Sequence, residues 1–155
     1  MNKEQIVYKK IIDAFKERST CERIQVSSII VKDGRIISTG WNGVPSGKKH
    51  CTKYFREKYS DPYNVVSFND EHRVFSERYE IHAEQNAIAY AARNGIKTNG
   101  TILYISLSPC LNCAKLICAA GIKKVFYFLE YDRSNAGIEF LNENNIQCKE
   151  LKWKI

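Results

Sequence analysis

The spacing of apolar side chains divides the first third of the chain into a helix and a hairpin. Residues from about Asn2 to Arg18 place apolar side chains at helical intervals with charges between them, which predicts an amphipathic helix. The stretch VSSIIVKDGRIISTGWNG then contains two β-branched runs around Lys32-Asp33-Gly34. Because Asp-Gly is a strong turn signal, these runs predict a β-hairpin.

The second half of the chain alternates between apolar strands and helices. The strand patterns are GTILYISL, KKVFYFLE and, more weakly, IQCKEL. The helical patterns are HAEQNAIAYAARNG with Asn94-Gly95 as a C-cap, CLNCAKLICAAG closed by Gly121, and SNAGIEFLNENN. Strands separated by helices pair in parallel, with the helices on the faces of the sheet. With the leading hairpin, this order predicts an α/β fold with a mixed sheet.

Residues from about 43 to 80 interrupt this alternation. They contain Pro45, Gly47, Pro62, several tyrosines and many charges, and we expect a long irregular loop that is functional or locally braced. The length of 155 residues is typical of one domain. We therefore expect a single domain over residues 1–155, with this loop as an insertion.

Charge and cysteine content narrow the classes of function. The 24 basic and 17 acidic residues give a formal net charge of +7, which suits an anionic ligand, either a nucleotide or a nucleic acid. The N-terminal residues have no apolar signal region and no stretch is long enough to span a membrane, so a reducing cytosol is expected. In that compartment, six cysteines indicate metal binding or catalysis rather than three disulfides.

Chemically active residues open two of the predicted helices. His82 and Glu84 begin one helix, and Pro109 precedes Cys110 and Cys113 at the start of the other. Two cysteines three residues apart lie on the same side of a first turn, where backbone N–H groups and the helix dipole favour thiolates. Together with the histidine they offer zinc three ligands and leave the fourth tetrahedral position to water. This is the pattern of a catalytic zinc site.

Glu84 lies two residues after His82, so the two side chains do not share a helix face. Glu84 is therefore poorly placed as a ligand and well placed as a general acid/base beside the metal. Alone, His-x-Glu is usually a surface pair, and Cys-x-x-Cys is found in structural zinc knuckles and redox pairs. Here both motifs open helices and an apolar strand leads into the second, which favours the zinc-deaminase signature.

These motifs, with the segments DGRIISTGWNGVPSG, EIHAEQNAI, AARNG, SPCLNCAKLI and GIKKV, resemble the cytidine/deoxycytidylate deaminase superfamily over nearly the whole chain. They are most similar to deoxycytidylate (dCMP) deaminases of the viral type, and least so from Thr52 to Phe75. The resemblance implies a three-layer α/β/α cytidine-deaminase-like fold with a mixed five-stranded sheet. It also implies zinc-dependent hydrolysis of dCMP to dUMP and ammonia, which supplies thymidylate synthesis. The preference among dCMP, dCTP and CMP stays open.

The resemblance assigns metal ligands and the proton carrier. It implies that the catalytic zinc is held by His82, Cys110 and Cys113, and that Glu84 transfers protons. Some viral members carry a second, structural zinc, whose ligands correspond by position to Cys21, Cys51, His72 and Glu80. Closed coordination there would brace the long loop. Without the resemblance, Cys21, Cys51 and His72 each have a structural or incidental interpretation.

The resemblance also assigns substrate contacts. Asn42 matches a residue at the sugar 3′-hydroxyl, the Ala83 backbone and Ser108 match residues that line the base, and Tyr131 matches a residue near the 5′-phosphate. For Asn42 an ordinary turn remains an alternative, because Asn-Gly is a common turn dipeptide. Trp41 stands where the family often has tyrosine.

Regulation is a further expectation from the resemblance. Family members are commonly activated by dCTP and inhibited by dTTP, bound with Mg²⁺ away from the zinc, and are often hexameric. Candidate effector residues are Asn42, Gly43 and Pro45 in the NGVPSG loop, whose glycine N–H groups could approach phosphates, and Arg93, which could reach a neighbouring subunit. The alternative is a plain turn and a solvated charge.

Two other functions stay open. A tRNA adenosine deaminase shares the zinc chemistry, and a basic chain could bind tRNA. Against it stand HAEQNA, the GWNGVPSG loop and the long insertion, which are typical of nucleotide deaminases. A zinc-braced nucleic-acid-binding module would not need Glu84. We expect a cytoplasmic homo-oligomer (in the host cytoplasm if viral) that acts on a small nucleotide, without a nucleic-acid or membrane partner.

Overall fold

The computed structural model describes residues 1–131 and 134–152. Within these residues, five strands form one sheet: β1 (Ser27–Lys32), β2 (Arg35–Trp41), β3 (Ile102–Ile105), β4 (Lys124–Tyr127) and β5 (Gln147–Glu150). The helices of the same residues are α1 (Lys3–Lys16), α2 (Cys51–Lys58), the 3₁₀ turn η1 (Pro62–Asn64), α3 (Phe68–Tyr79), α4 (Ala83–Arg93), α5 (Leu111–Ala119) and α6 (Ala136–Glu143). Across the described residues, no helix combines the length and apolar character needed to cross a membrane.

The sheet is mixed, as predicted. Its strand order is β2-β1-β3-β4-β5, in which β1 runs antiparallel to β2 and β3, whereas β3, β4 and β5 run parallel. The hairpin turns at Asp33 and Gly34, whose φ angles of 49° and 72° fit a type I′ turn. Parallel neighbours need crossover connections, which α5 and α6 provide.

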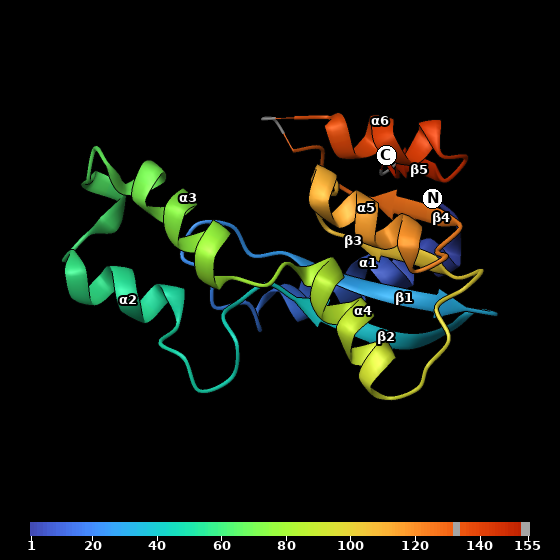
Figure 1. Ribbon diagram of the computed structural model, residues 1–155, viewed down its shortest axis with the longest axis horizontal. Helices are drawn as coiled ribbons and strands as arrows, with labels where there is room; N and C mark the ends of the chain where they lie inside the picture. Colours follow the sequence, from blue (N-terminus) through green and yellow to red (C-terminus); the bar gives the residue numbers. More distant parts are fainter. Residues whose placement is uncertain (132–133, 153–155) are drawn as a thin grey trace.

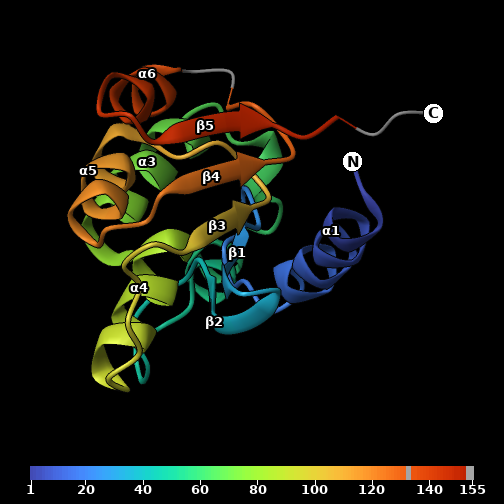
Figure 2. The ribbon, with the colours of Figure 1, turned by 90° about the vertical axis from the view of Figure 1, so that its right-hand side faces the viewer.

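Helices cover both faces of the sheet, which gives the predicted three layers (Figure 2). α1 begins at an Asn2 capping box and packs Tyr8 and Ile12 against the first face, together with Ile29 and Tyr104. α4, α5 and α6 cover the other face around a larger core that includes Ala87, Leu103, Ile117 and Leu141. β1 and β3 contribute residues to both cores and lie between them.

The segment between β2 and α4 corrects the prediction of an irregular loop over residues 43–80. Residues 51–58 and 68–79 form α2 and α3, which stand apart from the sheet in Figure 1. A third buried core there contains Phe55, Phe68 and Phe75 together with Cys21 and Cys51. Pro62 begins the turn η1 between the two helices. The breakers therefore mark junctions between short helices, and the buried aromatic residues hold these helices together.

Two glycines let helices approach the rest of the fold closely near the site. A Cβ on Gly40 of β2 would lie 2.2 Å from the carbonyl oxygen of Ala83, so the first turn of α4 rests directly on β2. A Cβ on Gly137 of α6 would lie 2.0 Å from the carbonyl oxygen of Pro109, so α6 rests on the segment that enters α5. Both predicted zinc-binding turns are therefore positioned by backbone contact.

Candidate metal centre and active site

The three residues predicted to bind a catalytic zinc lie together. His82 is the N-cap of α4, Cys110 is the N-cap of α5, and Cys113 lies in the first turn of α5. His82 Nδ1 is 3.6 Å from Cys110 Sγ and 3.4 Å from Cys113 Sγ, and the three ligand atoms lie within 4.8 Å of one another. In a tetrahedral site with Zn–N of about 2.0 Å and Zn–S of about 2.3 Å, nitrogen and sulfur are about 3.5 Å apart. The spacing therefore fits a zinc ion.

The electrostatics of this cluster also suit a cation. A hydrogen bond with Cys113, and a smaller contribution from His82, lower the pKa of Cys110 to about 4. The same contacts with Cys110 raise the pKa of His82 to about 9 and raise the pKa of Cys113. One thiolate is thus favoured at neutral pH beside a second thiol and a protonated imidazole, and metal binding releases the protons of Cys113 and His82.

Local hydrogen bonds fix the turn that carries His82. Its backbone N–H donates to Oε1 of Gln85 at 2.8 Å, which closes the N-terminus of α4. Nδ2 of Asn86 donates to the carbonyl oxygen of Trp41 at 2.6 Å, which ties the same turn to the end of β2. These bonds hold the imidazole at the edge of the sheet, opposite the two cysteines.

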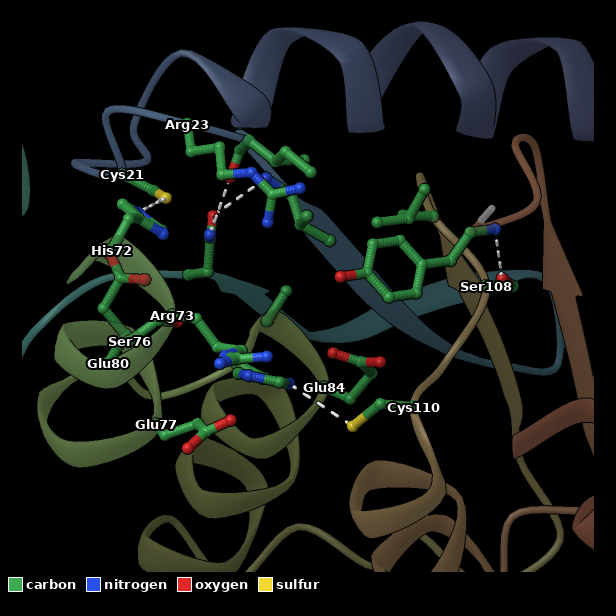
Figure 3. Close-up of a pocket in the computed structure, with 17 residues that line it drawn as sticks. Cys21, Arg23, His72, Arg73, Ser76, Glu77, Glu80, Glu84, Ser108 and Cys110 are labelled. Carbon is green, nitrogen blue, oxygen red and sulfur yellow. Dashed lines mark hydrogen bonds between the residues drawn. The ribbon is translucent and has the colours of Figure 1, made fainter. Parts of the chain in front are cut away.

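Glu84 lies beside the cluster and outside its ligand set. Its side chain is buried, with 3% of the residue exposed, and it lines the same cavity as His82 and Cys110 (Figure 3). Burial raises the pKa of the Glu84 carboxyl to about 7. A buried carboxyl next to a metal site, and free of metal ligation itself, is suited to transferring protons.

A cavity of about 370 Å³ adjoins the cluster. Its wall contains all four residues predicted to contact a substrate, namely Asn42, Ala83, Ser108 and Tyr131. The backbone N–H of Tyr131 donates to Ser108 Oγ at 2.8 Å, so the segment after β4 is held against the segment after β3 (Figure 3). The cavity therefore opens at the carboxyl ends of two parallel strands, where ligands bind in α/β sheets.

Sequence reasoning missed two arginines in the cavity wall, Arg23 and Arg73 (Figure 3). Arg23 lies in the segment before β1, and Arg73 follows His72 in α3. Both bring positive charge to a cavity whose wall also contains Glu77. Their only signal in the sequence is proximity to residues matched to a second metal site, since α3 itself was not predicted.

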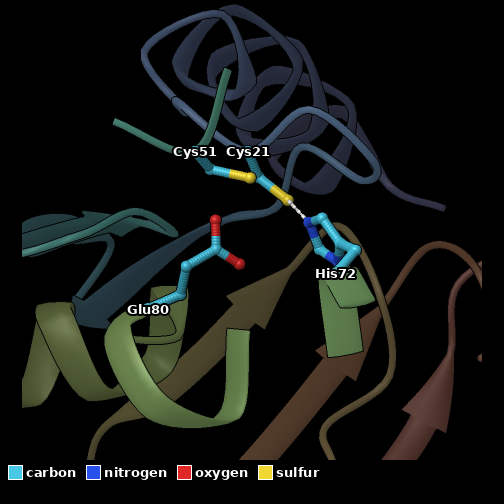
Figure 4. Close-up of side chains that lie close together, drawn as sticks. All are labelled: Cys21, Cys51, His72 and Glu80. Carbon is cyan, nitrogen blue, oxygen red and sulfur yellow. Dashed lines mark hydrogen bonds between the residues drawn. The ribbon is translucent and has the colours of Figure 1, made fainter. Parts of the chain in front are cut away.

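The four residues matched to a second metal site also lie together (Figure 4). Ligand atoms of Cys21, Cys51, His72 and Glu80 lie within 4.8 Å of one another, and Cys21 Sγ is 3.3 Å from His72 Nε2. The contact with Cys51 lowers the pKa of Cys21 to about 4 and raises the pKa of Cys51. Within the described chain, Glu80 Oε1 is buried without a hydrogen-bond partner. A buried carboxylate oxygen that lies close to two sulfur atoms and accepts no hydrogen bond fits a bound cation.

The two clusters are connected through the cavity and the backbone. Three ligands of the second cluster, all except Cys51, also line the cavity. Glu80 and His82 flank Ile81, whose backbone N–H donates to the Gly43 carbonyl oxygen at 2.8 Å and whose carbonyl oxygen accepts from the Gly43 N–H at 3.1 Å. The two clusters are therefore joined along the chain by one residue that is paired with Gly43.

The predicted effector residues are dispersed. Asn42 lines the cavity, Pro45 is exposed in the following loop, and Arg93 ends α4 with its guanidinium over the ring of Tyr90. An eleven-residue helix rises about 16 Å, so Arg93 is remote from this loop in its own chain. The N–H of Gly43 donates to the carbonyl oxygen of Ile81, and an effector site in this loop stays a prediction.

Comparisons with known proteins agree with this geometry. A family model for the cytidine and deoxycytidylate deaminase zinc-binding region matches residues 1–129. The deoxycytidylate deaminase of Enterobacteria phage T4 is 38% identical over 89% of this chain and 89% of its own length. A dCMP deaminase from the cyanophage S-TIM5, crystallised with dCMP and dUMP, is 32% identical over 97% of this chain and 99% of its own, with a TM-score of 0.77. A tRNA:A34 deaminase, 20% identical over 95% of this chain and 98% of its own, shares the fold with a TM-score of 0.55.

Proposed function

Because the chain belongs to the cytidine and deoxycytidylate deaminase family, we propose that it hydrolyses dCMP to dUMP and ammonia. One observation carries this proposal: buried Glu84 lies beside a His-Cys-Cys ligand set in a cavity of ligand size. The phage T4 relative is named for this activity, and the S-TIM5 enzyme was crystallised with dCMP and dUMP. The product dUMP would then supply thymidylate synthesis.

The residues that would hold the catalytic zinc are His82, Cys110 and Cys113. The fit rests on the ligand type and on the nitrogen–sulfur distances of 3.4 and 3.6 Å. A bound zinc ion supplies an activated water nucleophile at neutral pH. The bond from the His82 backbone N–H to the Gln85 side chain fixes the turn from which the imidazole meets the two sulfurs.

Glu84 carries the protons of the reaction. Its carboxylate accepts a proton from the attacking water and donates it to N3 of cytosine, which makes C4 electrophilic. The same carboxylate then takes the proton of the hydroxyl now on C4 and gives it to the amino group, which leaves as ammonia as C4 becomes a carbonyl. Burial of Glu84 excludes bulk water from this exchange, so the proton passes between carboxyl and base.

The cavity wall supplies the contacts that orient the nucleotide. The Ala83 backbone and Ser108 line the base, Asn42 meets the sugar 3′-hydroxyl, and Tyr131 lies toward the 5′-phosphate. The positive charge of Arg23 and of a second wall arginine, Arg73, favours a nucleotide over an uncharged nucleoside, because guanidinium groups bind phosphate strongly.

The second cluster would hold a structural zinc. Its ligands, Cys21, Cys51, His72 and Glu80, come from the segment before β1, from α2 and from α3, so one ion would join these elements. Closed coordination by four protein ligands is typical of structural zinc, which contributes directly to folding. Within the described residues, α2 and α3 are otherwise joined by side-chain packing and by the contacts of Glu71 with Lys58 and Tyr59.

Allosteric control by dCTP as activator and dTTP as inhibitor, each with Mg²⁺, is part of the same proposal. Its support in the chain is the pairing of Gly43 with Ile81, which would transmit a movement of the NGVPSG loop to both clusters. Arg93 would reach this loop only in a neighbouring subunit, so the proposal includes a homo-oligomer, with a hexamer as our expectation. The proposal also includes a single domain and a location in the cytoplasm, which is that of the host if the protein is viral. The cytoplasmic location agrees with six cysteines that form no disulfide.

Ammonia release from a panel of substrates tests the proposed function. Zinc-loaded protein is given dCMP, dCTP, CMP, deoxycytidine and a tRNA anticodon stem-loop under identical conditions. We expect dCMP to have the highest kcat/KM and to yield dUMP. Preferred conversion of adenosine in the stem-loop would replace this proposal with a tRNA adenosine deaminase, and inactivity on all five would leave a nucleic-acid-binding module.

A further inference from the structure

Asn42 is held by three hydrogen bonds at the cavity wall. Its Oδ1 accepts from Ser19 Oγ at 2.6 Å and from the backbone N–H of Val26 at 2.8 Å, and its Nδ2 donates to the carbonyl oxygen of Ile24 at 2.9 Å. The residue is 8% exposed and lines the cavity. Since Oδ1 has two lone pairs and both are used, the amide offers the cavity its second N–H. Asn42 therefore presents a donor, and a ligand must bring an acceptor.

Ser19 supplies the one side-chain contact among these three. Ser19 is buried, with 6% exposed, and does not belong to the cavity wall. Its Oγ donates to Asn42 and accepts the backbone N–H of Cys21 at 3.2 Å, so its orientation is itself fixed. The two backbone bonds determine which end of the amide faces the cavity. The hydrogen bond from the Ser19 hydroxyl is the third contact, and it fixes the plane of the Asn42 amide.

We infer that Ser19 is a positioning residue for substrate binding: its hydroxyl orients the Asn42 amide so that the remaining N–H meets the 3′-hydroxyl oxygen of the nucleotide. This inference rests on the proposed function, because it assumes a nucleotide in the cavity. Ser19 touches no ligand itself and acts only through Asn42. The same hydroxyl accepts from Cys21, so sugar recognition is also tied to the second cluster.

Product binding tests this inference without requiring turnover. Calorimetry compares dUMP with 2′,3′-dideoxyuridine monophosphate, which lacks the 3′-hydroxyl, on zinc-loaded wild type, Ser19→Ala and Ser27→Ala. Ser27 is the matched control, because it is a fully buried serine whose Oγ donates to the Ile12 carbonyl oxygen at 2.7 Å, away from the cavity wall. One neutral hydrogen bond corresponds to about a five-fold change in affinity. We expect the ratio of the affinity for dUMP to that for the dideoxy analogue to be about five for wild type and Ser27→Ala. For Ser19→Ala we expect a ratio near one.

The kinetics should show the same separation between binding and chemistry. Ser19→Ala should raise KM for dCMP by about five-fold with kcat nearly unchanged, since a contact made equally in ground and transition states affects binding alone. Zinc content should equal that of wild type. If Ser19→Ala does not fold, Ser19→Cys keeps the size with a weak donor, and the same ratio near one is expected.

Three results would overturn the inference. They are a wild-type ratio near one, an unchanged ratio in the Ser19 variant, and an equal loss in Ser27→Ala. Failure of the proposed function gives a different result. Wild type would then bind dUMP more tightly than the dideoxy analogue yet release no ammonia from dCMP, or it would bind neither nucleotide.

Discussion

Replacing Gly40 with alanine should damage catalysis and leave the protein folded, because it moves the turn that carries His82 and Glu84. The new Cβ would lie 2.2 Å from the carbonyl oxygen of Ala83 and 2.5 Å from the backbone nitrogen of Ala87. Both atoms belong to the backbone of α4, so no side-chain rotation relieves the contact. A tolerable carbon–oxygen distance requires α4 to retreat from β2 by about 1 Å.

The size of the effect follows from that displacement. Cys110 and Cys113 belong to α5, so a shift of α4 alone separates His82 and Glu84 from the sulfurs. A misplacement of 1 Å costs about 100-fold in rate, and overpacking of this kind costs about 1–3 kcal/mol of the free energy of unfolding. We therefore expect a folded variant whose kcat/KM for dCMP is lower by about 100-fold.

Gly95→Ala is the control on the same helix. Gly95 follows the opposite end of α4 with a φ of +66°, and no atom lies within 4 Å of its would-be Cβ. Alanine in this left-handed conformation costs about 1–2 kcal/mol of stability, and kcat/KM should stay near that of wild type. Steady-state ammonia release and urea unfolding followed by circular dichroism measure both quantities. Wild-type kcat/KM in Gly40→Ala, or an equal loss in Gly95→Ala, would refute the reasoning.

The remaining predictions concern the second cluster, the phosphate and the effectors. Cys51→Ser should lower the metal content from about two zinc ions per chain to about one, together with the melting temperature, and an unchanged zinc content would contradict a second site. Arg23→Gln should raise KM for dCMP by about tenfold and leave KM for deoxycytidine unchanged, because only the nucleotide carries a phosphate; equal effects on both would exclude this contact. Arg93→Glu should weaken activation by dCTP and inhibition by dTTP at unchanged zinc content, whereas hyperbolic wild-type kinetics indifferent to both would show that the switch is missing.

The catalytic cluster was predictable because the information for it is local. Cys110 and Cys113 are about one helical turn apart. The strand and the proline before them indicate where that helix begins. His82 and Glu84 similarly open an alanine-rich helix without breakers. Alternation of strands and helices, which is also a local pattern, was enough to predict the parallel half of the sheet.

Features that depend on distant contacts were not accessible in the same way. α2 and α3 have many charges, and their stability comes from a buried aromatic core that forms only when both helices meet. Cys21 and Cys51 are brought together by that packing, and only the family resemblance connected them beforehand. The close approach at Gly40 and the hydrogen bond from Ser19 to Asn42 join residues more than twenty positions apart, which no spacing rule describes.

The requirement for Glu84 in deamination, but not in metal binding, tests the account most directly. Glu84→Gln keeps the size of the side chain and removes its proton exchange, while Glu77→Gln makes the same change at an exposed residue of the same cavity wall. Conversion of dCMP to dUMP is measured in a single turnover with enzyme in excess, on samples of known zinc content. The account predicts wild-type zinc in both variants, near-normal conversion in Glu77→Gln, and a loss of at least about 100-fold in Glu84→Gln. Conversion by Glu84→Gln at a rate close to that of wild type would contradict it.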